Sequence, residues 1–153
     1  MKLIPLALAS ALVVGGTVAL AQSDVPAAVK ARQGQMQIQA LSIGILAGMA
    51  RGNIEYDAEL AAGAAHNLKS STEMNLAIMW PEGTSSDEVM SSRALPVIWE
   101  DWAGFEAEWA SFTVAVDAME AAAPQGLEAL QGAIGGVGRG CGSCHENWQL
   151  SNN

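Results

Sequence analysis

The chain has 153 residues, of which half are hydrophobic and 15% are charged. This length suits one folded domain with a substantial core and is too short for two domains of ordinary size. The formal net charge of −9 argues against binding to nucleic acids or to anionic membranes, because both attract cationic surfaces.

The N-terminal segment has the pattern of a secretory signal peptide. Lys2 is followed by an uncharged run over residues 3–21 that ends in Ala-Leu-Ala. A run of this length also approaches the ~20 apolar residues of a membrane anchor, but Pro5, two glycines and the small terminal residues favour cleavage. We therefore predict that residues 1–21 are a cleaved signal peptide and that residues 22–153 form one exported domain. That domain keeps six of the seven basic residues and all sixteen acidic residues, which gives a formal charge of −10.

Two stretches in the first half of this domain carry residues at alternating steps of three and four, the period of one helical face. The first stretch, with one charged member, comprises Val29, Arg32, Met36, Ala40, Ile43, Ala47 and Ala50. The second comprises Leu60, Ala64, Leu68, Ser71, Met74 and Ile78. Trp80-Pro81 then ends the second helix, because proline cannot continue a helix and restricts the residue before it.

Two further helical stretches follow the longest connection, residues 81–96, which is rich in glycine, serine and charge. The third stretch comprises Ile98, Trp102, Phe105, Trp109, Phe112, Val116 and Met119. After a break at residues 124–126, the fourth comprises Leu127, Leu130, Ile134, Val137, Cys141, Cys144 and Trp148. Four amphipathic helices without a strand pattern predict an all-α fold, an antiparallel up-down-up-down four-helix bundle.

The fourth stretch contains an internal conflict, because glycine costs about 1 kcal/mol relative to alanine inside a helix. Its glycines are Gly132, Gly135, Gly136, Gly138, Gly140 and Gly142. Two interpretations remain open. The segment is either a flexible loop, or a helix whose glycines let a large flat ligand approach its backbone.

The sequence "CGSCH" at residues 141–145 contains the only two cysteines of the chain. On a helix, Cys141, Cys144, His145 and Trp148 share one face. A thioredoxin-like redox pair normally accompanies a βαβ pattern, which this chain lacks. A structural zinc site needs four ligands, and the only other histidine, His66, is expected at the surface of the second helix.

A disulfide between the two cysteines would close a small strained ring and leave His145 without a role. Cys-x-x-Cys-His is also the pattern of c-type haem attachment, in which two thiols bond the porphyrin and the adjacent histidine ligates the iron. We therefore predict one covalently attached haem c on Cys141 and Cys144, with His145 as an axial ligand of the iron.

Over nearly its whole length, the exported domain resembles cytochrome c′ and its class II relatives. The resemblance lies in "ARQGQMQ", "YDAE", "WPEGTSS", "LPVIWEDWAGF" and "GGVGRGCGSCHENW". The C-terminal position of Cys-x-x-Cys-His is its most specific feature, because class I cytochromes c carry the motif near the mature N-terminus. The resemblance implies a four-helix haem protein of the periplasm.

The resemblance also implies roles for individual residues. Arg32 would lie near a haem propionate, Met36 over the distal face of the iron, and Trp148 near the proximal side. Each has a simpler interpretation, since Arg32 can extend its charge to water and the other two fill the core of any bundle. Gln149 departs from the many relatives that carry a basic residue at its position.

The resemblance to high-spin family members implies a protein that is not an enzyme. It would bind nitric oxide and carbon monoxide and take part in redox reactions or protection against nitric oxide. A low-spin electron carrier with Met36 as sixth iron ligand is the alternative, and a helical adaptor without haem is a third reading. Family members are commonly homodimers built on the first two helices, where Gly44 and Gly48 would permit close approach. The redox partner is not identified.

Overall fold

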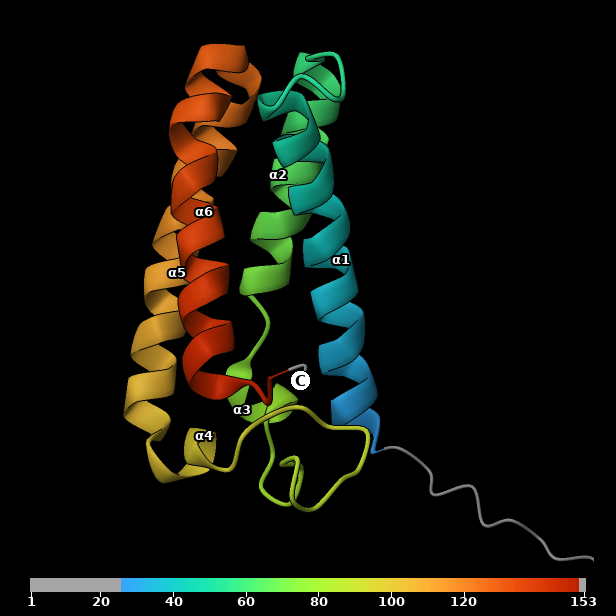
Figure 1. Cartoon of the computed structure of the whole chain (residues 1–153), viewed down its shortest axis with the longest axis vertical. Helices are drawn as coiled ribbons and strands as arrows, with labels where there is room; N and C mark the ends of the chain where they lie inside the picture. The colour runs from blue at the N-terminus through green and yellow to red at the C-terminus, as the bar shows by residue number, and fades with distance from the viewer. Residues whose placement is uncertain (1–25, 152–153) are drawn as a thin grey trace, which may run out of the picture.

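The computed structural model describes residues 26–151 and forms an all-α bundle. Its elements are α1 (Ala27–Ala50), α2 (Ala58–Thr72), α3 (Leu76–Met79), α4 (Val97–Glu100), α5 (Trp102–Ala122), the 3₁₀ turn η1 (Ala123–Gln125) and α6 (Leu127–Trp148). The four long helices alternate in direction (Figure 1), which confirms the predicted antiparallel bundle. The predicted signal peptide, residues 1–21, lies outside the described residues.

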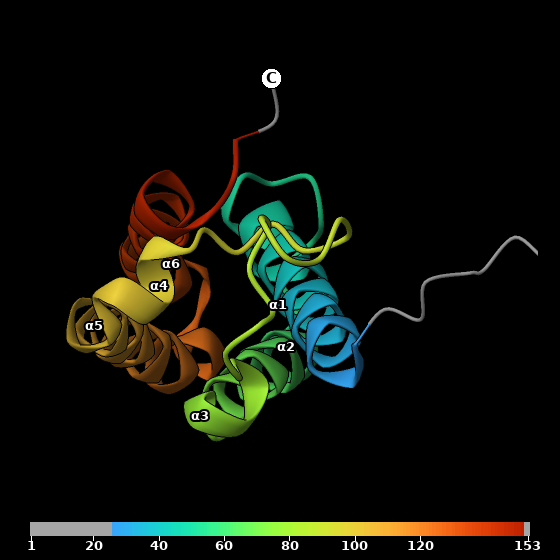
Figure 2. The same ribbon diagram turned by 90° about the horizontal axis from the view of Figure 1, so that it is seen from below.

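The long helices form two pairs. Seen from the end that carries α3 and α4 (Figure 2), α1 and α2 lie on one side and α5 and α6 on the other. The connection between α3 and α4 crosses this end of the bundle. No helix of the described part of the chain combines the length and the apolar character needed to cross a membrane.

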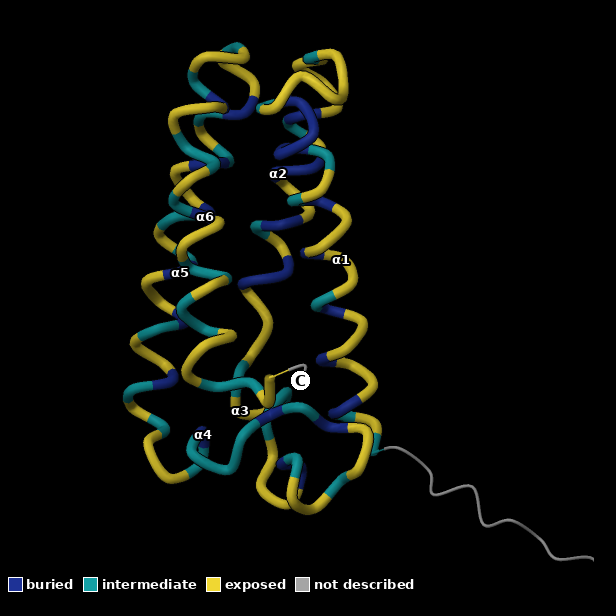
Figure 3. The backbone as a smooth tube through the Cα atoms, in the orientation of Figure 1, coloured by how far each residue is buried: buried dark blue, intermediate teal, exposed yellow. Residues whose placement is uncertain are grey.

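Two clusters of buried side chains form the core. Figure 3 shows where along the backbone the buried residues lie. The larger cluster includes Leu46, Leu68, Phe112, Val116, Met119, Leu130 and Val137. The smaller one centres on Ala94, Ile98 and Phe105, with four tryptophans packed against it. Most of the predicted apolar face of residues 98–119 is therefore buried, although a break at Asp101 divides this stretch into α4 and α5. Asp101 caps α5 by accepting a hydrogen bond from Gly104 N at 3.0 Å.

The buried face of α1 differs from the predicted apolar series. Ala40 is exposed and Met36 only half-buried, whereas Gln35 and Gln39 are buried. Both amides bond Ser71 of α2, Gln35 Nε2 through the main-chain oxygen at 2.6 Å and Gln39 Nε2 through Oγ at 3.1 Å. The spacing of apolar residues did not identify the buried positions of α1 here, because a polar amide can also be buried when it has a hydrogen-bond partner.

The predicted continuation of the second helix to Ile78 is wrong, because α2 ends at Thr72. The hydroxyls of Ser71 and Thr72 donate to main-chain carbonyls three residues earlier, at 2.6 and 2.7 Å. The Lys69 carbonyl lies in the last turn of α2, where a helix end leaves carbonyls without an intrahelical partner. Asn75 then caps the single turn of α3 by accepting from Ile78 N at 3.0 Å, and the Ile78 side chain is 74% exposed.

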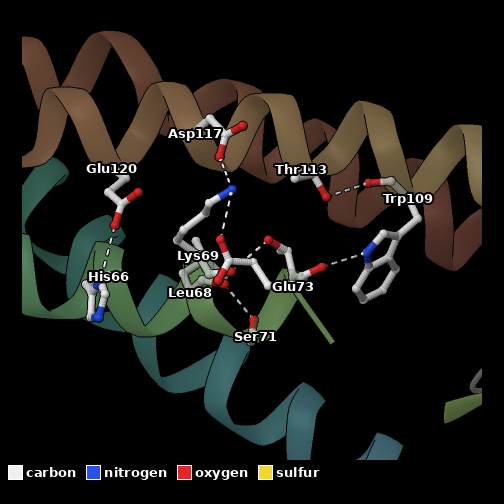
Figure 4. Close-up of polar contacts among 10 residues, drawn as sticks. His66, Leu68, Lys69, Ser71, Glu73, Trp109, Thr113, Asp117 and Glu120 are labelled. Carbon is white, nitrogen blue, oxygen red and sulfur yellow. Dashed lines mark hydrogen bonds and ion pairs between the residues drawn. The ribbon is translucent and has the colours of Figure 1, made fainter. Parts of the chain in front are cut away.

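Polar side chains join α2 to α5 on the outside of the bundle (Figure 4). His66 lies at the surface, as predicted, with its Nδ1 3.2 Å from Glu120 Oε1. Lys69 lies between Asp117 and Glu73 and pairs with both. The hydrogen bond to Asp117 is the main reason that the pKa of Lys69 lies above its ordinary value. Exposed pairs of this kind contribute little to stability individually, so the core and the buried polar contacts matter more.

Candidate haem-binding site

A cavity of about 300 Å³ lies among α1, α5, α6 and the connection before α4. Both core clusters contribute to its wall, the larger through Phe112 and the smaller through Phe105. The cavity also brings together every residue that the sequence predicted for the site: Arg32, Met36, Cys141, Cys144, His145 and Trp148. These residues come from helices at opposite ends of the sequence, so the bundle assembles one site from them.

The segment that carries the cysteines is helical throughout, so the flexible-loop interpretation of residues 127–148 is wrong. Of its six glycines, only Gly140 lines the cavity. A Cβ added at Gly140 would lie 2.9 Å from Phe112 Cδ2, closer than van der Waals contact allows. Glycine at this position therefore lets α6 lie against α5 immediately before the first cysteine.

Cys141 and Cys144 are free, half-buried thiols, so no disulfide joins them. Burial raises the pKa of Cys141. Burial, followed by the charges of Glu108 and Cys141, raises the pKa of Cys144 to about 12. No group of three or more His, Cys, Asp or Glu side chains that could hold a metal ion occurs among residues 26–151. His145 follows directly on α6 and lines the same cavity.

Arg32 is buried at the edge of the cavity, with 5% of the residue exposed, so it does not extend to water. Its guanidinium donates to Met79 O at 3.2 Å, Thr84 Oγ1 at 2.8 Å, Thr84 O at 2.9 Å and Ser92 Oγ at 3.4 Å. It also lies 4.5 Å from the centroid of the Trp80 ring. Burial lowers the pKa of Arg32.

The neutral surroundings of Arg32 leave its charge available to an anion. All four hydrogen bonds from the guanidinium go to carbonyl or hydroxyl oxygens, and no ion pair with a carboxylate of the described residues accompanies them. A buried charge is normally paired, because desolvation is costly. A negatively charged group in the cavity would supply that pair, and the propionate of a haem fits this requirement.

Two indole groups of the cavity wall carry unsatisfied donors. The Nε1 atoms of Trp80 and Trp148 are buried and have no hydrogen-bond partner among the described residues. Both rings pack edge-on against Phe105, with centroid distances of 4.8 and 5.8 Å. Apolar aromatic walls with a few unpaired polar groups suit a ligand that is largely flat and apolar but has polar edges. A porphyrin has this character, so these residues fit a haem.

The C-terminal tail is held against the connection that precedes α4, a contact that the sequence pattern did not indicate. Leu95 N donates to Trp148 O at 3.1 Å, and Leu150 N donates to Arg93 O at 2.8 Å. Between them lies an antiparallel bridge that pairs residues 94 and 149, the only strand-like pairing of the described chain. Gln149 thereby lines the cavity beside Trp148.

Sequence reasoning missed two kinds of cavity residue. Gln39 gave no signal because it lies outside the apolar series, and Ser92 lies in a connection without periodicity. Trp80 did carry a signal, since it is a tryptophan at the end of a predicted helix, but no sequence pattern predicted its contact with Arg32.

Comparison with known proteins identifies the family. The family model described as Cytochrome C' matches residues 27–149. A cytochrome c′ of Cereibacter sphaeroides is 38% identical over 84% of this chain and 86% of its own length. A cytochrome c-554 of the same species is 37% identical over 97% of this chain and 98% of its own length.

Solved structures agree with this similarity. The cytochrome c′ from Rhodobacter spheriodes has a TM-score of 0.79 and 38% identity, covering 82% of this chain and 96% of that chain. Two variants of the cytochrome c′ from Alcaligenes xylosoxidans, one with bound carbon monoxide and one ferrous with bound NO, have TM-scores of 0.71 and 0.72. Both are 28% identical and cover 81% and 82% of this chain, and 94% of theirs. The chain therefore belongs to the cytochrome c′ family, electron-transfer and gas-binding proteins that carry covalently attached haem c.

Proposed function

We propose that this protein is a periplasmic haem protein that binds nitric oxide and carbon monoxide at an open iron position and takes part in redox reactions or in protection against nitric oxide. The observation that carries the proposal is a single cavity lined by the Cys-x-x-Cys-His motif of α6 and by Met36 of α1. When bound, the haem supplies an iron that takes up diatomic gases and exchanges one electron.

The residues of α6 hold the group. The thiols of Cys141 and Cys144 would hold the porphyrin through two thioether bonds, and His145 would provide a nitrogen ligand to the iron. Arg32 would pair with a propionate and Trp148 would pack on the proximal side, which would account for a buried cation without an acidic partner and for an unpaired indole donor.

Met36, which lines the cavity, would cover the gas-binding side of the group without bonding to the iron. An apolar side chain there gives no hydrogen bond to the partial negative charge on bound dioxygen, whereas nitric oxide and carbon monoxide depend much less on such a bond. The complexes of the Alcaligenes xylosoxidans relative with carbon monoxide and NO support gas binding by this chain, because that protein shares the fold.

The second candidate is a low-spin electron carrier in which the Met36 sulfur is the sixth ligand. It is favoured by the thioether that lines the cavity and by nearly equal identity to relatives called cytochrome c-554 and cytochrome c′. A non-haem adaptor has no comparable support, since membership of the family implies haem.

We also infer export and self-association. The segment over residues 1–21 supports export, and a mature protein beginning at Gln22 is the result that N-terminal sequencing should give.

The outward surface of α1 and α2 carries Leu41 and Leu60, 67% and 47% exposed, beside a shallow groove. A second copy of the chain would cover them. Gly44 is open at this surface, but Gly48 is buried against Ile54 of its own chain, so its predicted role in the contact is wrong.

Extraction with acidified organic solvent tests the haem assignment. Cys141→Ala and Cys144→Ala should each leave one thioether, and the double variant should release its haem. The unaltered protein should retain the haem, and addition of carbon monoxide to its reduced form should shift the Soret band. Release of haem from the unaltered protein would contradict the assignment of both thiols, and an unchanged Soret band would contradict gas binding.

A further inference from the structure

We propose that Gln39 discriminates among gas ligands by turning its amide oxygen toward the cavity that Met36 lines. The proposal rests on the proposed function, because it places the ligand in the same cavity. It adds a second residue to the distal wall, at a position that neither the apolar pattern nor the predicted site included.

Gln39 is a buried polar residue of the cavity wall. Gln39 is 6% exposed and lines the cavity. Along α1 it follows Met36 by three residues, and Arg32 precedes Met36 by four, so the methionine lies between two buried polar side chains about one helical turn away. Arg32 is committed to the connection before α4, whereas Gln39 reaches toward α2.

The hydrogen bonds of Ser71 fix the orientation of the Gln39 amide. Ser71 Oγ donates its one hydrogen to Leu68 O at 2.6 Å. Its contact with Gln39 at 3.1 Å must therefore be one in which the hydroxyl accepts and the amide nitrogen donates. This network assigns the nitrogen to the α2 side and turns the Gln39 oxygen away from α2.

The neighbouring amide of Gln35 provides a comparison within the same helix. Gln35 donates to the main-chain oxygen of Ser71, but it is 2% exposed and does not line the cavity. Its Oε1 is enclosed by protein and has no partner among the described residues. Gln39 Oε1, by contrast, is not among the buried, unpartnered side-chain atoms of the described residues, and Gln39 lines the cavity, so we infer that its oxygen faces the cavity. Of the two amides that bond Ser71, Gln39 is thus the one placed to act on a ligand.

An acceptor oxygen beside the ligand has a defined electrostatic effect. It repels the partial negative charge that bound dioxygen carries on its outer atom, and the repulsion is strong in a cavity of low dielectric constant. Nitric oxide and carbon monoxide accumulate less charge and lose less affinity. Gln39 therefore rejects dioxygen actively, where an apolar wall would only fail to stabilise it.

The infrared C–O stretching frequency of the reduced, carbon monoxide-bound holoprotein tests this proposal, because it reports the electrostatic potential at the ligand. A negative potential raises the frequency, so Gln39→Leu should shift the band to lower frequency. Gln39→Met, which preserves an unbranched side chain, should produce the same shift if the leucine variant packs poorly. The matched control is Gln35→Leu, which removes the neighbouring amide bonded to Ser71 and should leave the band unchanged.

Three results separate the inference from the function on which it rests. A lower frequency in both Gln39 variants, with an unchanged Gln35→Leu band, supports the proposal. An unchanged or higher frequency in the Gln39 variants overturns it while leaving gas binding intact. Failure of the unaltered reduced protein to bind carbon monoxide contradicts the proposed function itself.

Discussion

The contact between Gly140 and Phe112 predicts that glycine-to-alanine substitutions on α6 change the free energy of unfolding in opposite directions, depending on their position. Gly140→Ala places a Cβ 2.9 Å from Phe112 Cδ2, 3.4 Å from its Cβ and 3.5 Å from its Cα. The ring is buried and packs against Trp109 at a centroid distance of 6.0 Å, so it has little space to retreat. Relief must therefore come from movement of α6 away from α5.

Two opposing effects set the magnitude. Alanine gains about 1 kcal/mol over glycine in a helix interior. Overpacking a filled core costs about 1–3 kcal/mol. Gly140→Ala should therefore lower the free energy of unfolding by about 0–2 kcal/mol, as the cost exceeds the gain. Gly132→Ala is the matched control on α6, because its added Cβ meets nothing within 4 Å and it should stabilise the protein by about 1 kcal/mol.

Guanidinium unfolding of the holoprotein, followed by far-ultraviolet circular dichroism, measures both variants. Gly132→Ala should raise the midpoint, and Gly140→Ala should leave it unchanged or lower it. Movement of α6 should also alter the visible haem spectrum of Gly140→Ala alone, because the shifted turn carries Cys141. Equal increases in midpoint for the two variants would refute the claim that close helix approach requires glycine at position 140.

Three further substitutions test contacts around the cavity. Arg32→Met removes buried hydrogen bonds from a charged donor and should lower the free energy of unfolding, measured by chemical denaturation, by about 1.5–3 kcal/mol. Arg51→Met, at the exposed end of α1, is the control and should change it very little. Equal effects of the two substitutions would contradict the buried role of Arg32. Tyr56→Phe leaves the oxygen of residue 123 and the nitrogen of Gly126, both 2.9 Å from the hydroxyl, without that partner, and should lower the free energy of unfolding by about 1–3 kcal/mol in the same assay. Gln149→Arg adds a cation beside the proximal side of the site, and charge-assisted hydrogen bonds are about twice as strong as neutral ones. Stopped-flow traces should show altered nitric oxide kinetics with unchanged carbon monoxide kinetics. Identical nitric oxide traces for the variant and the unaltered protein would exclude Gln149 from the mechanism.

The sequence predicted most accurately where apolar burial or covalent chemistry determines the residue. The series from Ile98 to Met119 is buried at all but one of its positions, because large aromatic and aliphatic side chains gain most from leaving water. The haem motif was located because two cysteines and a histidine within five residues have few chemical uses. Helical spacing then placed Cys141 and Trp148 on one wall of the cavity.

The features that could not be predicted depend on polar contacts between distant segments. The burial of Gln39 requires Ser71, thirty-two positions along the chain, and no period in the sequence expresses that pairing. The end of α2 at Thr72 similarly depends on hydroxyl groups that bond the backbone, while the apolar period continues to Ile78. Hydrogen bonds of this kind stabilise one tertiary arrangement and leave no mark on composition.

The visible absorption spectrum of the purified protein, oxidised and reduced, tests the proposal that the haem iron has His145 as its one protein ligand. We expect a five-coordinate high-spin spectrum without a sulfur-to-iron charge-transfer band at the red edge. Met36→Ala should keep that spectrum and speed the binding of carbon monoxide, because the change opens the distal face. A low-spin spectrum with such a band, lost in Met36→Ala, would contradict the proposed five-coordinate iron and identify Met36 as the sixth ligand of an electron carrier.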